Sequence, residues 1–374
     1  MDDWFKKIRM VIASEAVLCL IAVFGIFCRI EEGGGWQTLF GLEYLTKWND
    51  SMETTSKGFL TWVDFDVTYE ALCEAYRLDV ETYGQDVHMD WISTLAYLGC
   101  KYGGDFAGNT KKISGDLEKL KRKLTGDDTG MGNKITMEEL TEDMKYYLYY
   151  KEAYEAVLGG MVGEYEMESE NEAGEIIWKQ VYGLKSYSPI AKGFAYSDFD
   201  DFGTSRSFGY KRQHLGHDMM GQIGTPIIAI ESGYVEAIGW NRYGGWRIGI
   251  RSFDKKRYYY YAHLRQNFPY TEGLEQGSVV TAGDVIGYMG HTGYSDKENV
   301  NNIKVTHLHW GMQLIFDESQ KEGDSEIWID VYALTRFLYK HRSEAKKIEG
   351  TVYWERENDI RDPDVERYLA ELFE

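Results

Sequence analysis

The first hydrophobic feature of the chain is a nearly unbroken apolar run from Met10 to Cys28. A helix of about 20 apolar residues spans the core of a bilayer. Three basic residues lie just before the run, namely Lys6, Lys7 and Arg9. Positive charge on one flank marks the cytoplasmic side. The pattern therefore predicts a single membrane-spanning helix with the remaining chain outside the membrane.

In this interpretation residues 1–9 are a cytoplasmic tail, 10–28 the transmembrane anchor and 29–56 a linker. A cleaved signal peptide is the alternative, and its cleavage site would be built from Gly33 to Gly35, since no small-x-small motif ends the apolar run. We favour the uncleaved anchor, which predicts a single-pass protein of the cell membrane with an extracytoplasmic soluble part.

Residues 57–163 carry apolar positions at helical spacing and are expected to form an α-helical domain. Asp90 is a predicted helix cap, and Thr136 with Glu139 forms a capping-box pattern. The predicted core stripes are Tyr69, Leu72, Cys73, Tyr76, Val80 and Tyr83, then Trp91, Leu95, Leu98 and Tyr102, then Leu117, Leu120 and Leu124. No motif assigns this region, so it is interpreted as a spacer or as an interaction module for an envelope protein partner.

A glutamate-rich stretch, 164–197, is predicted to be an acidic linker, because charge runs are usually solvated. From 198 to 346 short apolar runs alternate with glycine and aspartate turns, which predicts a mostly antiparallel β domain. Asp254 to Lys256 is the expected tip of one hairpin. A helix is expected over Tyr332 to Lys346, and 347–374 is expected to be an acidic tail. The predicted fold class is α+β and multidomain.

Composition narrows the function. The 374 residues carry 61 acidic and 41 basic side chains, a formal charge of −20. Nucleic-acid-binding proteins normally show the opposite balance, so that class is disfavoured. Four cysteines are too few for a disulfide scaffold. Cys73 and Cys100 lie beyond the predicted anchor, and a buried free thiol explains Cys73 as well as a disulfide would.

The candidate chemistry lies in histidines of the β region. In an extended chain His214 and Asp218 point to the same side, with Gly216 between them leaving room for a metal, whereas His217 points away. His307 and His309 share one face of a strand whose other face carries Leu308, Trp310, Met312 and Leu314. His263 ends a tyrosine-rich strand. Two imidazoles and a carboxylate form a typical catalytic zinc site with an open position for water.

Other histidines carry less information. His88 and His341 are interpreted as structural. His291 is expected near the cleft without an assigned role. A neighbouring imidazole can move a proton near neutral pH, and no helical His-Glu-x-x-His motif is present, so histidine would have to serve as the base.

These motifs, taken in order, resemble the lysostaphin-type (LytM-like) zinc metallopeptidases, which cut peptides of bacterial peptidoglycan. The resemblance covers Phe202 to Phe316. It rests on His214-x-x-x-Asp218, Gly224-Thr-Pro226, Gly233-Tyr-Val235, Tyr261-Ala-His263-Leu264, the glycine pattern from Gly283 to Gly293, and His307-Leu-His309-Trp310.

The resemblance implies one zinc ion per chain bound by His214, Asp218 and His309. It implies that His263 and His307 flank the metal-bound water, and that the fold is a small antiparallel β domain with a groove walled by loops. The sequence departs from the family in two places. Residues 294–306 are longer and lack the usual Ser-Thr-Gly stretch, and Trp310 replaces the commoner Phe. Both departures bear on groove shape and substrate choice.

The leading hypothesis is a membrane-anchored zinc endopeptidase that hydrolyses peptidoglycan peptides outside the cell. The alternative is an envelope scaffold that uses the same domain to bind the wall or a partner protein without hydrolysis. A third interpretation, an endopeptidase acting on proteins or bacteriocin-like peptides, shares the chemistry and differs only in substrate.

Overall fold

The computed structural model describes residues 59–126, 134–208, 210–321 and 325–372. The predicted cytoplasmic tail, anchor and linker (1–9, 10–28 and 29–56) lie outside these residues. Within the described ranges, no helix combines the length and the apolar character needed to cross a membrane. Phe59–Glu374 forms one compact unit. The predicted domain boundaries within this unit remain predictions.

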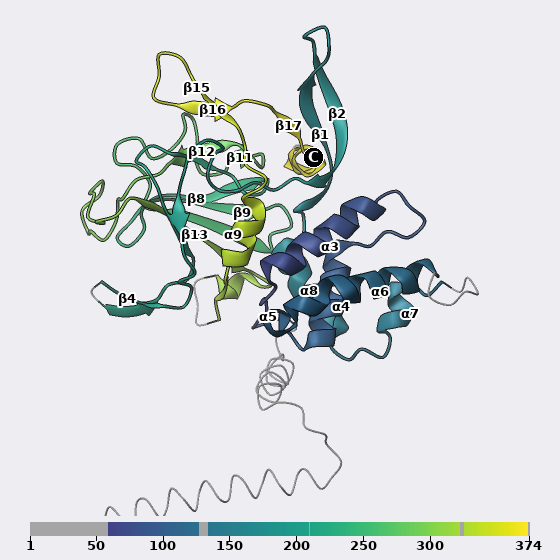
Figure 1. Ribbon diagram of the computed structural model, residues 1–374. Coiled ribbons are helices and arrows are strands. Elements are labelled where there is room, and N and C mark those ends of the chain that lie inside the picture. Colours follow the sequence, from purple (N-terminus) through teal and green to yellow (C-terminus); the bar gives the residue numbers. More distant parts are fainter. Residues whose placement is uncertain (1–58, 127–133, 209, 322–324, 373–374) are drawn as a thin grey trace, which may run out of the picture. The chain divides into compact units, whose positions relative to one another are not determined.

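The first described part of the chain is helical, as predicted (Figure 1). Asp90 caps its helix by accepting the backbone N–H of Ser93 at 2.7 Å, and Thr136 with Glu139 forms the expected capping box. The helices are α3 (Tyr69–Thr82), α4 (Trp91–Tyr102), α5 (Phe106–Asn109), the 3₁₀ turn η1 (Thr110–Lys112), α6 (Ile113–Thr125), α7 (Met137–Thr141) and α8 (Tyr147–Leu158).

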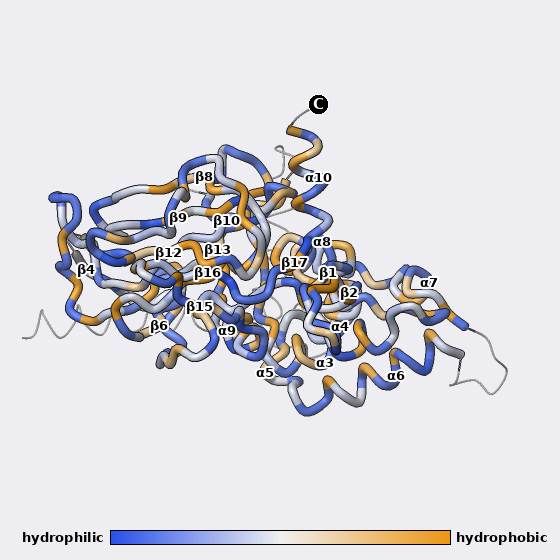
Figure 2. Tube along the Cα trace, turned by 90° about the horizontal axis from the view of Figure 1, so that it is seen from above, coloured by the Kyte–Doolittle hydropathy of each residue, from blue (hydrophilic) through white to orange (hydrophobic). Residues whose placement is uncertain are grey.

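The predicted core stripe on α6 is confirmed, since Leu117, Leu120 and Leu124 are buried. Hydrophobic and hydrophilic positions alternate along this helix in Figure 2. On α3 the prediction was partly wrong. Val80 and Tyr83 are more than a third exposed, whereas Asp79 is fully buried. Asp79 can be buried because its carboxylate is hydrogen-bonded, which a pattern of apolar positions cannot reveal.

The stretch predicted as an acidic linker forms most of a long antiparallel hairpin, β1 (Val162–Glu170) and β2 (Ile176–Leu184), with β17 (Ile360–Arg361) paired to β1. The expectation of a solvated linker was wrong because the glutamates from Glu164 to Glu172 stand at every second position. Tyr165, between two of them, is buried. This two-residue period belongs to a strand with one solvated face.

The β region contains an eight-stranded sheet in the order β11-β8-β9-β10-β13-β6-β3, with β14 paired to β13. Every pairing in it is antiparallel, as predicted. The predicted tip at Asp254 to Lys256 lies between β9 and β10. The strands are β3 (Ser197–Asp198), β6 (His217–Met220), β8 (Gly233–Asn241), β9 (Gly245–Ser252), β10 (Arg257–Ala262), β11 (Val279–Val280), β13 (His307–Leu314) and β14 (Ile327–Ile329).

Smaller strand pairs flank this sheet. The hairpin formed by β4 (Ser205–Phe208) and β5 (Tyr210–Gln213) directly precedes His214. A second pair is β7 (Pro226–Ile228) with β12 (Val285–Tyr288). A 3₁₀ turn, η2 (Glu318–Gln320), follows β13.

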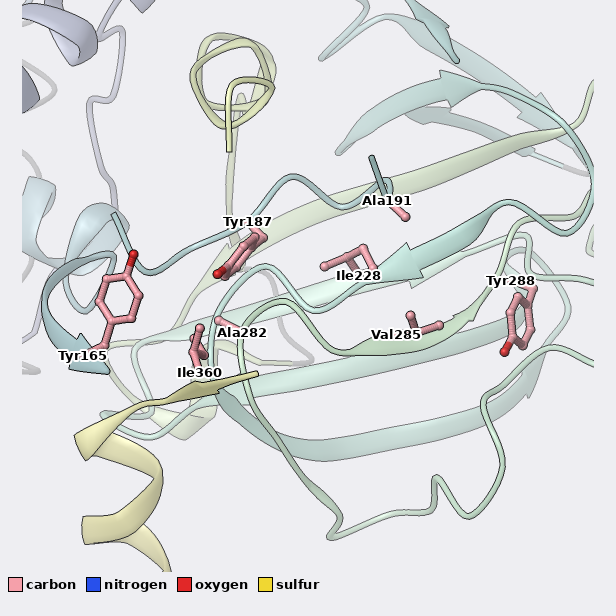
Figure 3. Packing of buried hydrophobic residues seen from close by; sticks show 8 residues of the cluster. All are labelled: Tyr165, Tyr187, Ala191, Ile228, Ala282, Val285, Tyr288 and Ile360. Atoms are coloured by element: carbon pink, nitrogen blue, oxygen red, sulfur yellow. The ribbon is translucent and has the colours of Figure 1, made fainter. Parts of the chain in front are cut away.

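The C-terminal part corrects two expectations. The helix predicted over Tyr332 to Lys346 ends early, as α9 (Tyr332–Leu338), and is followed by β15 (Ala345–Lys347). The predicted acidic tail is also structured, with β16 (Trp354–Arg356), β17 and α10 (Pro363–Leu372). Ile360 of this tail is buried in one hydrophobic cluster with Tyr165, Tyr187, Ala191, Ile228, Ala282, Val285 and Tyr288 (Figure 3). Burial of its apolar residues holds the tail against the β region.

Candidate metal centre

Strand pairing brings the predicted site residues together. Asp218 on β6 lies directly opposite His309 on the neighbouring strand β13. On the other side of β13, Ala262 of β10 lies opposite His309, and His263 follows it. His307 lies two positions before His309 and shares its face, while Leu308, Trp310, Met312 and Leu314 are buried as expected. The register of these strands therefore places Asp218, His307 and His309 on one face, and His214 and His263 lie just outside the paired strands.

Three side-chain atoms form a close triangle in this site. His214 Nε2 lies 3.0 Å from Asp218 Oδ1 and 2.9 Å from His309 Nδ1, and the last two atoms are 2.9 Å apart. Within the described ranges, these residues are the group of His, Cys, Asp and Glu side chains placed to share one metal ion. Two imidazoles and one carboxylate are also the ligand types that zinc accepts.

The partners of His214 show why a cation fits this triangle. His214 Nδ1 lies 3.3 Å from the backbone oxygen of Asp201 and 3.2 Å from its carboxylate. These acceptors place the proton of the neutral ring on Nδ1 and leave a lone pair on Nε2. That lone pair faces the Asp218 oxygen at 3.0 Å, a contact that a shared cation makes favourable.

Asp201 was not predicted from the sequence. Its carboxylate is buried, with 3% of the side chain exposed, and it also pairs with Arg206. The His214 ring donates to the Asp201 backbone oxygen, and the Asp201 carboxylate lies 3.2 Å from Nδ1 without a hydrogen bond. An acceptor for the outer N–H of a metal-binding histidine fixes the orientation of the ring. Asp201 precedes His214 by 13 positions and meets it at the base of the β4–β5 hairpin, where His214 N–H donates to the Thr204 carbonyl. No periodic spacing in the sequence signals such a contact.

His263 and His307 lie beside the triangle. His263 donates Nδ1–H to the Thr292 carbonyl at 2.9 Å, and His307 donates Nδ1–H to the Val305 carbonyl at 2.8 Å. Each ring therefore keeps a bare Nε2, and that of His307 lies 3.6 Å from Asp218 Oδ1. The two ring centroids are 4.7 Å apart.

The backbone at His263 is unusual. Its φ angle of 62° lies in the left-handed region, which is costly for a residue other than glycine. The conformation is held by two hydrogen bonds, from His263 N–H to the Gly244 carbonyl at 2.7 Å and from Gly290 N–H to the His263 carbonyl at 3.0 Å. Strain of this kind is concentrated at functional sites.

Burial sets the protonation states of the site. It lowers the pKa of His263 well below the ordinary value, with a further contribution from the neighbouring His307. Burial lowers the pKa of His309 more than Asp218 raises it. At Asp218 burial opposes ionisation, but contacts with His214 and His309 outweigh it and hold the pKa of the carboxyl below its usual range. Neutral imidazoles beside an ionised carboxylate are the forms that bind a metal.

Gly216 is required by the packing of His309. A Cβ atom there would lie 2.6 Å from His309 Cε1 and 2.7 Å from the Trp310 carbonyl oxygen. The glycine therefore makes room for the His309 ring, which crosses from the neighbouring strand over the backbone at this position. That it also leaves room for the metal stays a prediction.

The remaining histidines of the described chain have other partners. His217 points away from the triangle, as expected, and its Nε2 lies 2.9 Å from Asp198 Oδ2. His88 contacts Asp79, and His341 donates to the Ser186 carbonyl at 2.7 Å. His291 donates to the Ile303 carbonyl at 2.7 Å.

The sequence of this region is similar to that of known peptidases. Residues 212–322 match the model of peptidase family M23. This segment is an M23 peptidase domain. It nearly coincides with the stretch that resembles the LytM-like metallopeptidases, and that resemblance is confirmed. The helical region lies outside the match, and its role as spacer or interaction module stays a prediction.

Relatives of this segment include an endopeptidase and lysostaphin. The chain is 35% identical over 159 residues to the L-Ala–D-Glu endopeptidase of Bacillus subtilis (strain 168), covering 42% of this chain and 45% of that protein. It is 40% identical over 83 residues to lysostaphin of Staphylococcus simulans, covering 22% and 16%. The chain thus spans less than half the length of either relative.

A solved structure of a candidate glycyl-glycine endopeptidase, lytM of Ruminococcus gnavus ATCC 29149, is 28% identical. The matched region covers 55% of this chain and 71% of that chain, with a TM-score of 0.39.

Proposed function

We propose that this protein is a zinc metalloendopeptidase that hydrolyses peptide bonds of peptidoglycan. The observation that carries the proposal is the triangle of His214, Asp218 and His309 inside an M23 domain, with His263 and His307 beside it. The relatives, an L-Ala–D-Glu endopeptidase and lysostaphin, support the substrate class.

The mechanism assigns a task to each group. His214, Asp218 and His309 would hold zinc, with Asp201 orienting the His214 ring. Zinc bound there supplies a Lewis acid that polarises the scissile carbonyl and acidifies water. His263 and His307 present bare Nε2 atoms, so one can accept the proton of the attacking water. The resulting imidazolium can stabilise the negative oxygen and return the proton to the leaving amine.

Placement outside the cell membrane is part of the same proposal. It rests on the apolar run from Met10 to Cys28 and on the basic residues before it. Peptidoglycan lies outside the membrane, so an anchor with this orientation would hold the peptidase domain beside its substrate.

The test uses the full 374-residue chain purified in detergent, loaded with zinc and incubated with bacterial cell walls of several peptide chemotypes. We expect about one zinc per chain and the release of wall peptides, identified by mass spectrometry. His309→Ala should abolish peptide release because it removes one imidazole of the triangle.

His88→Gln is the matched control, because His88 binds Asp79 far along the chain from the triangle. It should retain both zinc and activity. If the wild-type protein binds zinc and adheres to walls but leaves all chemotypes intact, hydrolysis is refuted and the scaffold alternative is supported.

A further inference from the structure

The β4–β5 hairpin places two arginines side by side next to the candidate metal centre. Arg206 and Arg212 are direct cross-strand partners, so their side chains leave the same face of the hairpin. Arg206 pairs with Asp201 and lies 3.6 Å from Asp218. The face that carries both arginines is therefore the face toward the metal centre.

Arg212 differs from Arg206 in lacking an acidic partner among the described residues. Its Nη2–H donates to the Tyr294 hydroxyl at 2.8 Å, and its guanidinium lies over the rings of Tyr243 and Tyr294 at 5.2 and 5.4 Å. Its Nε atom is buried with no hydrogen-bond partner in the described part of the chain. Tyrosine rings offset only a small part of the cost of holding a guanidinium away from water.

Two contacts locate Arg212 relative to the reacting groups. The Tyr294 ring that it bonds lies 6.0 Å from the His263 ring in an edge-on contact. Burial raises the pKa of Tyr260, whose ring lies 6.0 Å from that of His309, and the charge of Arg212 opposes this in small part. The guanidinium is thus one aromatic ring, Tyr294, away from His263.

This arrangement has an electrostatic cost. Like charges directly opposite on a hairpin repel each other, and only Arg206 is compensated by a carboxylate. The chain as a whole carries a charge of −20, so an anionic substrate meets general repulsion that a local cation would offset. A fixed guanidinium with free N–H groups is suited to bind a carboxylate.

We propose that Arg212 binds a free carboxylate on the substrate, carried by the residue next to the cleaved bond. The inference rests on the proposed function and names the substrate class more closely, as a peptide with an acidic residue such as γ-linked D-glutamate at the cleavage point. Tyr294 is a positioning residue that holds the guanidinium toward the site.

The test compares two synthetic stem peptides that differ in one group. One carries L-alanyl-γ-D-glutamate with its free α-carboxylate, and the other carries the corresponding α-carboxamide. The zinc-loaded full chain should cleave the carboxylate peptide with a kcat/KM about tenfold to a hundredfold higher, the range expected for a charge-assisted hydrogen bond.

In Arg212→Gln the ratio of the two kcat/KM values should fall to near one, and Arg212→Lys should give an intermediate ratio because it keeps the charge without the planar fork. Lys211→Gln is the matched control. It removes the same charge from an exposed neighbour whose side chain leaves the other face of the strand, so the wild-type ratio should persist.

Binding of both peptides, measured by isothermal titration calorimetry, separates this inference from the proposed function. If neither peptide is cleaved, the proposed stem-peptide hydrolysis is refuted. The ratio of the affinities for the two peptides still tests whether Arg212 binds the carboxylate. Equal use of the two peptides by the wild type, or an equal loss for both in Arg212→Gln, would overturn the assignment and leave Arg212 a structural residue.

Discussion

Asp79 and Asp218 each meet histidine, and comparing their surroundings distinguishes a structural carboxylate from a candidate metal ligand. Asp79 in the helical region accepts three hydrogen bonds, from His88 Nε2 at 2.8 Å, from the Tyr182 hydroxyl at 2.6 Å and from the backbone N–H of Trp91 at 2.8 Å. Every contact has its own proton donor. This carboxylate is satisfied by the protein and attaches the β1–β2 hairpin to α3.

Asp218 in the M23 domain has a different environment. Its Oδ1 faces His214 Nε2 and His309 Nδ1, which also face each other. Because the Asp201 backbone oxygen accepts the outer N–H of His214, the three contacts within the triangle have fewer protons than they would need as hydrogen bonds. A carboxylate beside histidine is thus structural when donors surround it, and a candidate ligand when lone pairs surround it.

The largest effect on zinc binding and activity is expected from a substitution of Asp218. Asp218→Asn removes the anionic ligand, so zinc should be lost and peptide release should fall about a thousandfold or more, which corresponds to several kcal/mol of Lewis-acid stabilisation. Zinc content and wall hydrolysis measure this directly. Full activity with normal zinc content in Asp218→Asn would contradict the comparison.

The same substitution at Asp79 should affect only the stability of the fold. Asp79→Asn leaves at least one donor of the buried network without its acceptor, and the free energy of unfolding should fall by about 2 kcal/mol. Urea denaturation followed by circular dichroism measures the loss. Zinc affinity should match that of the wild type, and a weakened metal site would show that the two groups are not independent.

A change in the partner of His214 should weaken the metal site without abolishing it. Asp201→Asn keeps the size of the side chain but removes its charge, and zinc affinity should fall about tenfold to a hundredfold. Competition with a chromophoric chelator gives the affinity. Unchanged affinity would mean that the backbone oxygen of Asp201 alone orients the ring.

The smallest effect is expected for His88→Gln. His88 is about a third exposed, and glutamine can still donate to Asp79, so the free energy of unfolding should change by less than about 1 kcal/mol. Thermal unfolding in the presence and absence of zinc checks this expectation. A large loss would show that Asp79 depends on an imidazole specifically.

Several of these features could be predicted from the sequence. His214, Asp218, His263, His307 and His309 stand in short motifs whose order is informative, and strand alternation places most of them correctly. The β1–β2 hairpin was missed because its glutamates resemble a charge run, although they alternate with buried Tyr165.

Other features depend on contacts that no local pattern encodes. Asp201 meets His214 at the base of a hairpin, and Gly216 is required by a ring from a strand far along the sequence. The burial of Ile360 against Tyr165 likewise follows only from tertiary packing, so the last residues were predicted as a tail.

Zinc-edge X-ray absorption on the full chain, with metal content measured on the same sample, tests the central claim most directly. We predict about one zinc per chain, a spectrum of nitrogen and oxygen ligands with the scattering pattern of two imidazoles, and loss of the signal in His309→Ala. The described cysteines, Cys73 and Cys100, are free thiols outside the triangle. Sulfur scattering, or a spectrum unchanged in His309→Ala, would place the zinc elsewhere and contradict the account.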